Sequence, residues 1–201
     1  MNLSPKKTWL TLTIVLFTLS VSGFAAGPVP NDPLYIRLDD GWKGVYGQGS
    51  AYAEYILKGA DVKPQDAHHI LLKPGLGMMV TFAAKKDIGG GGDLLGRHAE
   101  WELAYWRQHA TSVESAVRGD LSGGRDDLRV TEITLHNSAG AQMKIYMLAL
   151  ASDEGVFVLS ISPANAGIDS LVREIAASFK LVNHPLDLDE VKRLSLAASG
   201  R

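Results

Sequence analysis

The chain of 201 residues contains no cysteine, which excludes disulfide bonds, cysteine-based catalysis and lipid attachment through a cysteine. It also lacks a run of basic residues, so its composition gives no electrostatic basis for binding nucleic acid. Its longest apolar run, about Trp9 to Val21, is shorter than the roughly 20 residues that a membrane-spanning helix needs. We therefore expect no retained membrane anchor and a domain stabilised by its own hydrophobic core.

The N-terminal segment has the order of charged, apolar and small residues that is typical of a signal peptide. Lys6 and Lys7 precede the apolar run, and Gly23-Phe24-Ala25 places small residues where a signal peptidase reads them. This predicts a signal peptide over residues 1–25, cleaved after Ala25, and a bacterial protein that is periplasmic or secreted. Removal of two lysines from 20 basic residues leaves 18 against 22 acidic ones, a net charge of −4 with histidine neutral.

The remaining chain is long enough for one domain with a substantial core. We expect a single α+β domain over residues 26–183, followed by a short helical tail over residues 184–201. His184-Pro185 separates the two parts, and the narrow apolar stripe of the tail is too short for a helix that is stable alone.

The stretch from Gly155 to Val182 is the expected centre of the fold. Val156 to Ile161 is apolar at every position except Ser160, which predicts a strand buried on both faces. The segment that follows has apolar residues at helical spacing, up to Phe179, so it predicts a helix that covers one face of the sheet.

The rest of the chain alternates short strand patterns with turn residues. Helical spacing over Asp93 to Val113 predicts the longest helix, with Asp93 as its N-cap. In the strand 128–136, Glu132 lies among apolar residues, which predicts a bulge or an edge position. Strands are predicted at residues 34–38, 51–58, 69–72, 78–83, 115–121, 128–136, 141–151 and 156–161.

The order of these elements resembles the Mog1/PsbP-like group, which includes the DcrB-type bacterial periplasmic proteins. The similarity rests on Asp40-Gly41-Trp42 after the first strand and on Ile175 to Val182 (IAASFKLV) at the end of the last helix. The resemblance implies an antiparallel sheet of about six strands with helices packed on both faces. It implies a group of binding or assembly proteins, and it transfers no catalytic residue and no cofactor.

One arrangement in the sequence could carry chemistry: the column of His98, Glu102 and His109 on the predicted long helix. Imidazole and carboxylate groups four residues apart can share Zn²⁺. However, His109 lies about 10 Å further along the helix axis than Glu102 and needs a ligand from another element to join the same ion. The alternative is a polar seam beside the buried face, with an ion pair between His98 and Glu102.

No local motif for nucleophilic catalysis is present, although a dispersed serine, histidine and aspartate site is compatible with the sequence. The sequence favours an exported, non-enzymatic protein-binding module of the cell envelope, either an accessory protein or an immunity protein against a toxin. Its expected partner is another envelope or secreted protein. The two alternatives are a periplasmic protein that binds a small ligand or metal, and a hydrolase with a dispersed site.

Overall fold

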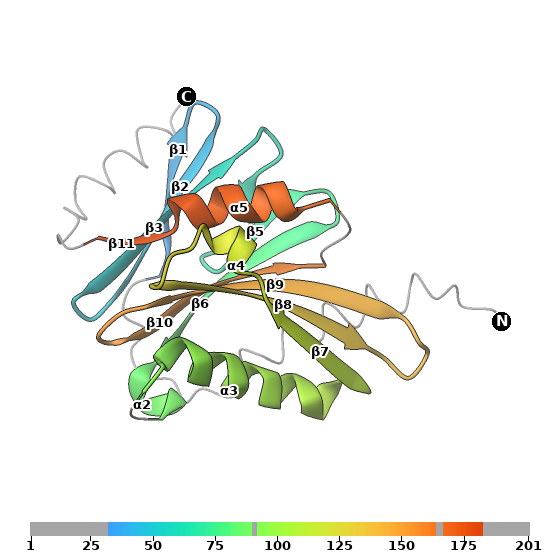
Figure 1. Ribbon diagram of the computed structural model, residues 1–201. Coiled ribbons are helices and arrows are strands. Elements are labelled where there is room, and N and C mark those ends of the chain that lie inside the picture. The colour runs from blue at the N-terminus through green and yellow to red at the C-terminus, as the bar shows by residue number, and fades with distance from the viewer. Residues whose placement is uncertain (1–31, 90–91, 164–166, 183–201) are drawn as a thin grey trace.

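The computed structural model describes residues 32–89, 92–163 and 167–182 (Figure 1). The predicted signal peptide and the predicted C-terminal tail lie outside these residues. The described chain is a mixed α+β structure, and every strand pair in it is antiparallel. No helix among the described residues has the length and apolar character to cross a membrane.

The larger sheet has seven strands and contains the predicted central strand. Their order across the sheet is β4 (Lys63–Pro64), β5 (His69–Lys73), β6 (Leu76–Ala84), β10 (Gly155–Ser162), β9 (Gln142–Ala151), β8 (Leu128–His136) and β7 (Ser112–Val117). Strand β10 lies between β6 and β9, which confirms that residues 156–161 form a central strand beside residues 141–151.

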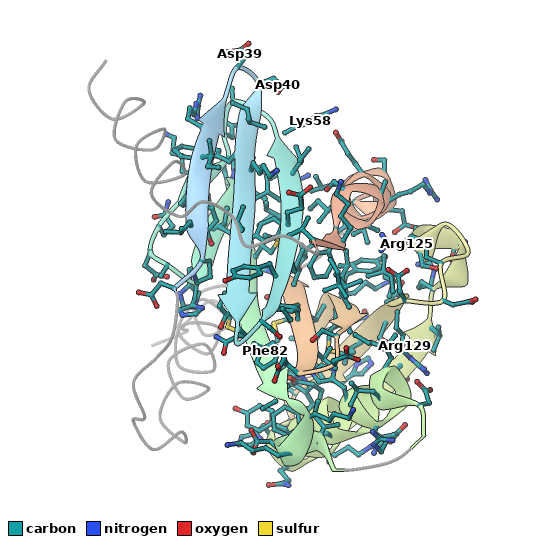
Figure 2. All side chains as sticks on the ribbon, turned by 90° about the vertical axis from the view of Figure 1, so that its left-hand side faces the viewer. Asp39, Asp40, Lys58, Phe82, Arg125 and Arg129 are labelled. Carbon is teal, nitrogen blue, oxygen red and sulfur yellow. The ribbon has the colours of Figure 1, made fainter. Side chains whose placement is uncertain are left out.

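The remaining four strands form a second sheet, in the order β1 (Leu34–Leu38), β2 (Gly41–Gln48), β3 (Ala51–Lys58) and β11 (Lys180–Val182). The prediction of one sheet of about six strands is therefore wrong in this respect. The N-terminal strands pair with β11, a strand of three residues, and not with the larger sheet. Figure 2 shows Asp39 and Asp40 at the tip of the β1–β2 hairpin, where the sequence predicts a turn.

Strand β2 forms despite its three glycines because tyrosine side chains of β3 cover two of them. Gly44 lies opposite Tyr55, and Gly47 lies opposite Tyr52. A Cβ atom at either glycine would overlap the facing tyrosine ring. Glycine weakens a strand, but an aromatic ring on the neighbouring strand can restore the lost packing.

Four helices are described: α2 (Lys85–Ile88), α3 (Leu94–His109), α4 (Gly119–Ser122) and α5 (Asp169–Ser178). Helix α3 ends four residues earlier than predicted, because Ala110 is extended and the Thr111 N–H donates to the His136 carbonyl oxygen (2.9 Å). Val113 therefore belongs to β7. Asp93 occupies the N-cap position, but its side chain makes no capping hydrogen bond and lies instead 3.4 Å from Arg129.

Strand β10 separates two hydrophobic clusters. Val156 and Val158 belong to one cluster, which includes Leu95, Ala99 and Leu103 of α3. Phe157, Leu159 and Ile161 belong to the other, with Val172 and Ile175 of α5, Phe179 beyond it, and Ala53, Tyr55 and Leu57 of β3. Figure 1 shows α3 and α5 on opposite sides of the larger sheet in this view.

The end of α5 is held by an arginine from the loop before β8. Arg125 donates to the carbonyl oxygens of Ala176 (3.1 Å) and Phe179 (2.6 Å), and its position beside α5 is labelled in Figure 2. Carbonyl groups at a helix C-terminus lack intrahelical partners and carry partial negative charge, so a guanidinium group stabilises them. Phe179 and Leu159 are each only 1% exposed, which confirms that both belong to the core.

Candidate functional site on helix α3

Helix α3 presents large aromatic side chains on the side that faces away from the core. Leu95, Ala99 and Leu103 pack inward, whereas Trp101 is 40% exposed. Val117 is the one other large hydrophobic residue among the described residues that is clearly exposed. Single exposed apolar residues are common on protein surfaces, so Trp101 marks a candidate binding site only together with the features around it. Tryptophan is nevertheless one of the residues that dominate the binding energy of protein interfaces.

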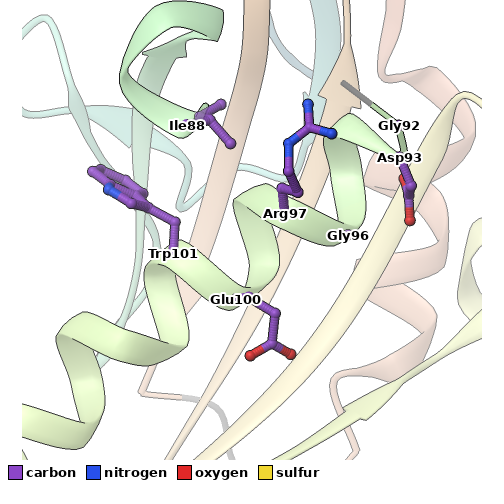
Figure 3. Close-up of a pocket in the computed structure, with 7 residues that line it drawn as sticks. All are labelled: Ile88, Gly92, Asp93, Gly96, Arg97, Glu100 and Trp101. Carbon is purple, nitrogen blue, oxygen red and sulfur yellow. The ribbon is translucent and has the colours of Figure 1, made fainter. Parts of the chain in front are cut away.

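Trp101 borders a hollow of about 710 Å³ between α2 and the first turns of α3 (Figure 3). The hollow is lined by Ile88, Gly92, Asp93, Gly96, Arg97, Glu100 and Trp101. It is open to solvent and not enclosed, unlike the deep sites that surround most small ligands. The hollow can therefore receive a side chain from another molecule more readily than it can enclose a whole substrate.

Three ring-bearing residues, Trp101, Tyr105 and His109, form what we call the aromatic row. Their spacing of four residues places them on one side of the helix. The rings of Tyr105 and His109 stack with centroids 4.3 Å apart, and His109 Nδ1 lies 2.7 Å from the Tyr105 carbonyl oxygen. These contacts hold His109 against Tyr105 and fix the outer part of the row before any partner binds.

His98 lies beneath the aromatic row, with its ring centroid 6.0 Å from that of Trp101. Its side chain is fully buried, and its Nε2 atom lies 3.7 Å from Glu102 Oε1. Burial lowers the pKa of His98 to about 4 and raises the pKa of Glu102 to about 7. Burial therefore opposes both charges of the predicted ion pair, so that at neutral pH the imidazole is uncharged and the carboxyl is partly protonated.

The third residue of the predicted column, His109, stacks on Tyr105 in the exposed last turn of the helix. Within residues 32–89, 92–163 and 167–182, no group of three or more histidine, cysteine, aspartate or glutamate side chains converges on a position suited to a metal ion. The structure thus brings His98 and Glu102 together but does not add His109 to them as a third ligand.

Several buried polar atoms of α3 have no hydrogen-bond partner among the described residues. They are Nδ1 and Nε2 of His98, Nε of Arg97 and the hydroxyl of Tyr105. Buried polar groups in folded proteins are nearly always hydrogen-bonded, so such a concentration on one helix calls for an explanation. These atoms have almost no exposed surface, so a partner on the outer side of the helix does not reach them in this conformation.

A second polar cluster, which sequence reasoning missed, lies on the opposite side of the larger sheet. Arg118 donates to Asp120 (2.9 Å), Glu132 (2.6 Å) and Asp169 (2.7 Å). The Tyr146 hydroxyl also donates to Asp169 (2.6 Å), and Lys144 lies 2.6 Å from Glu132. We call these six residues the Arg118 network.

The Arg118 network explains the position of Glu132. Strand β8 pairs in uniform register with β7 and β9, so the predicted bulge or edge position is wrong. Glu132 is accommodated because Arg118 and Lys144 neutralise it. The lone glutamate among apolar residues was the one sequence signal of this cluster.

Each charged group of the Arg118 network is paired with another member of the network. The network therefore serves to position α5. The hydrogen bond from Tyr146 and the interaction with Arg118 lower the pKa of Asp169. Burial and the bond to Asp169 raise the pKa of Tyr146. A carboxylate and a hydroxyl held in these states are poor general bases, so the geometry favours a structural link between the start of α5 and the sheet.

Comparison with known proteins does not relate this site to any characterised one. A scan against family models, a search of curated proteins and a search of solved structures each give no significant match.

Proposed function

We propose that this chain is an exported, non-enzymatic protein-binding module of the bacterial cell envelope, and that the outer side of α3 is its contact surface. The partner is another envelope or secreted protein, which this module either assists or, as an immunity protein, blocks. The occupant we expect on α3 is a protein segment with an apolar side chain that enters the hollow beside Trp101.

The observation that carries this proposal is the 40% exposure of Trp101 at the rim of an open hollow. Tryptophan, tyrosine and arginine dominate the binding energy of protein interfaces, and Trp101, Tyr105 and Arg97 lie together on α3. The ring of His109 stacks on Tyr105 and holds this part of the aromatic row in place before binding. Less side-chain entropy is therefore lost when a partner binds.

The test is affinity capture of the mature protein from an envelope extract, with a partner identified at a stoichiometric ratio. Trp101→Ala should abolish capture of that partner, because truncation of a central interface tryptophan weakens binding by at least about 2 kcal/mol. Arg173→Ala on α5, which is also exposed, should leave capture unchanged. Capture that Trp101→Ala does not reduce would locate the contact elsewhere.

A second candidate function is binding of a small ligand or metal ion at His98 and Glu102. Its support is that both ring nitrogens of His98 are buried and have no hydrogen-bond partner in the part of the chain that the structure describes; Nε2 lies 3.7 Å from Glu102 Oε1. Two ligands from one helix turn are too few for a closed zinc site, which takes four. This candidate therefore ranks below the protein-binding one.

We also infer that the fold is a variant of the Mog1/PsbP-like α/β/α arrangement, with helices on both faces of the larger sheet. The support is that α3 packs with one hydrophobic cluster and α5 with the other. Export is supported by the residue order at the N-terminus. The isolated soluble protein should begin at Ala26, and N-terminal sequencing that found Met1 would contradict export.

A further inference from the structure

The four-stranded sheet, which we call the small sheet, has an apolar face that packs with neither hydrophobic cluster. Tyr46, Tyr55 and Leu57 on its inner face belong to the cluster around α5. Successive residues of a strand point to opposite faces, so the residues between these lie on the outer face. We call the aliphatic residues of that face the outer patch: Leu34, Ile36, Leu38, Val45, Ile56 and Val182.

The side chains of the outer patch are shielded from water, although no described helix lies over them. Val45, at the centre of the sheet face, is only 2% exposed. The other five residues are half-buried, and none of the six belongs to either hydrophobic cluster. In the view of Figure 2 the strands β1 to β3 lie in front, and none of the described helices lies in front of them. Val45 therefore requires cover from a segment outside the described elements.

The charged side chains beside the outer patch leave this face positive. Lys43 and Lys180 both contact Glu54, at 2.5 and 3.1 Å. Because two lysines share one glutamate, this part of the face carries a net positive charge. A segment that is acidic where it passes Lys43 and Lys180 therefore complements the face.

We propose that the predicted C-terminal helix of this chain, residues 187–198, packs on the outer patch. The chain leaves β11 at Val182, which is itself part of the patch. The five residues from there to Asp187 span up to about 18 Å when extended. Strand β1, the farthest in the small sheet, lies three strand spacings or about 14 Å from β11. The whole outer patch is thus within reach of the tail.

The tail has the length and the pattern that the outer patch requires. A helix of 12 residues is about 18 Å long, and β3 from Tyr52 to Lys58 is about 20 Å long. At 100° per residue, the helical spacing places four apolar residues on one side and the neighbouring charges on the other. The four apolar residues are Leu188, Val191, Leu194 and Ala198.

Charge and connectivity favour the tail over a second copy or another protein. The tail begins with three acidic residues, Asp187, Asp189 and Glu190, which follow the strand that carries Lys180. A helix of this length is unstable alone and needs a surface to pack on. Its covalent link to β11 gives it a high effective concentration at the outer patch. Packing of the tail there leaves the outer side of α3 as the surface open to a partner.

The absence of cysteine gives a direct test in the full mature chain. Val45→Cys introduces one thiol, which should react with dithionitrobenzoate as slowly as that of Val158→Cys, a 1% exposed position in the larger sheet. Addition of Leu194→Asp should speed the reaction at position 45 by at least about tenfold, because a carboxylate is costly to bury against aliphatic side chains. The matched control is Leu196→Asp, on the opposite side of the predicted helix, which should leave the reaction slow.

The thiol at position 158 should stay protected with Leu194→Asp, since the larger sheet does not depend on the tail. Rapid reaction at position 45 in the chain with an unaltered tail overturns the proposal, as does protection that persists with Leu194→Asp. Protection that grows with protein concentration places a second copy on the face and overturns it as well.

A second measurement leaves the apolar side of the tail intact. Spin labels at Asp39→Cys, on the β1–β2 turn, and at Arg193→Cys should give one narrow distance distribution if the tail is packed on the small sheet. This measurement decides the matter if Leu194→Asp also exposes position 158. A broad distribution overturns the proposal.

Discussion

Gly44 lies directly across the β2–β3 ladder from Tyr55, and the tyrosine ring occupies the space where a Cβ atom of residue 44 would be. Tyr55 is fully buried and also contacts the Phe179 ring edge-to-face, with centroids 6.2 Å apart. The small sheet and the end of α5 therefore pack together through Tyr55. The ring of Tyr55 also limits the size of the residue at position 44.

Gly44→Ala should lower the free energy of unfolding by about 1 to 3 kcal/mol, the usual effect of excess volume in a close-packed core. Denaturant unfolding measures this change. The matched control is Gly119→Ala, where an added Cβ meets no atom within 4 Å. If both variants unfold at the same denaturant concentration as the wild type, the Tyr55 ring does not occupy the place described.

Phe179→Ala should lower the free energy of unfolding by about 3 to 5 kcal/mol, because it leaves a cavity where both sheets meet. The exposed Arg173→Ala should change it by less than about 0.5 kcal/mol. Thermal and urea unfolding of the two variants gives the comparison. An unchanged melting temperature for Phe179→Ala would show that the buried face of α5 is assigned wrongly.

The buried pair on α3 predicts an unusual dependence of stability on pH. Burial raises the pKa of Glu102 from 4.5 to about 7, so the folded protein holds this proton more tightly than the unfolded chain does. The carboxyl therefore favours folding below about pH 4.5, and that contribution is lost as the pH rises to about 7. His98 acts in the opposite sense, because its pKa falls from 6.5 to about 4. Its contribution is present above about pH 6.5 and is lost as the pH falls towards 4.

Glu102→Gln should remove the first of these opposing effects. Relative to wild type, its free energy of unfolding should rise between pH 4.5 and pH 7 by up to about 3 kcal/mol, since one pKa unit corresponds to 1.36 kcal/mol. Urea unfolding at several pH values measures the difference. Glu100→Gln, an exposed neighbour on α3, should follow the wild type at every pH. A Glu102→Gln curve parallel to that of the wild type would mean that Glu102 ionises normally.

The Arg118 network predicts a loss of stability in acid. Hydrogen bonding from Tyr146, followed by the contact with Arg118, keeps the pKa of Asp169 below 3.8. Its contribution is fully present above about pH 3.8 and is lost as the pH falls through the lower folded value. Asp169→Asn should cost about 1 kcal/mol at pH 7, a small value because the carboxylate is half-exposed. Asp169→Asn should also make the fall in free energy of unfolding at acid pH smaller than in the wild type. Asp126→Asn should leave that fall unchanged.

Zinc should leave the melting temperature unchanged. A site of micromolar affinity would add about 2.7 kcal/mol at a hundredfold excess of free ion, whereas a structural contact between His98 and Glu102 adds nothing. A rise of several degrees that disappears in both His98→Ala and Glu102→Ala would place the ligand-binding function ahead of the protein-binding one.

The sequence predicted those parts of the fold that carry a regular local pattern. The apolar run of β10 and the helical spacing before Phe179 were sufficient to place both elements in the core. Strand β11 could not be predicted, because three residues carry no period and its partner Glu54 is 126 residues earlier than Lys180. The end of α3 was missed because Val113 continues the helical stripe but is held by β8.

The candidate site was predicted only in outline. Helical spacing placed His98 and Glu102 side by side, but it could not show that burial suppresses both charges. The Arg118 network draws on β8, β9, α5 and the segment before α4, so no local window contains it. Trp101 and Val117 have ordinary sequence surroundings, and only the packed structure shows them to be exposed.

The pairing of β3 with β11 has a consequence for the order in which the molecule forms. A chain that emerges N-terminus first, from the ribosome or from a membrane during export, releases β1, β2 and β3 early, but the strand that completes their sheet is the last one described. Tyr55 also receives its Phe179 contact only at that stage. Contacts so distant in sequence form slowly, so the first hairpins keep an open edge until residue 182 has emerged. During that interval the unfinished edge is available to chaperones, and a chain truncated before α5 would keep it exposed permanently.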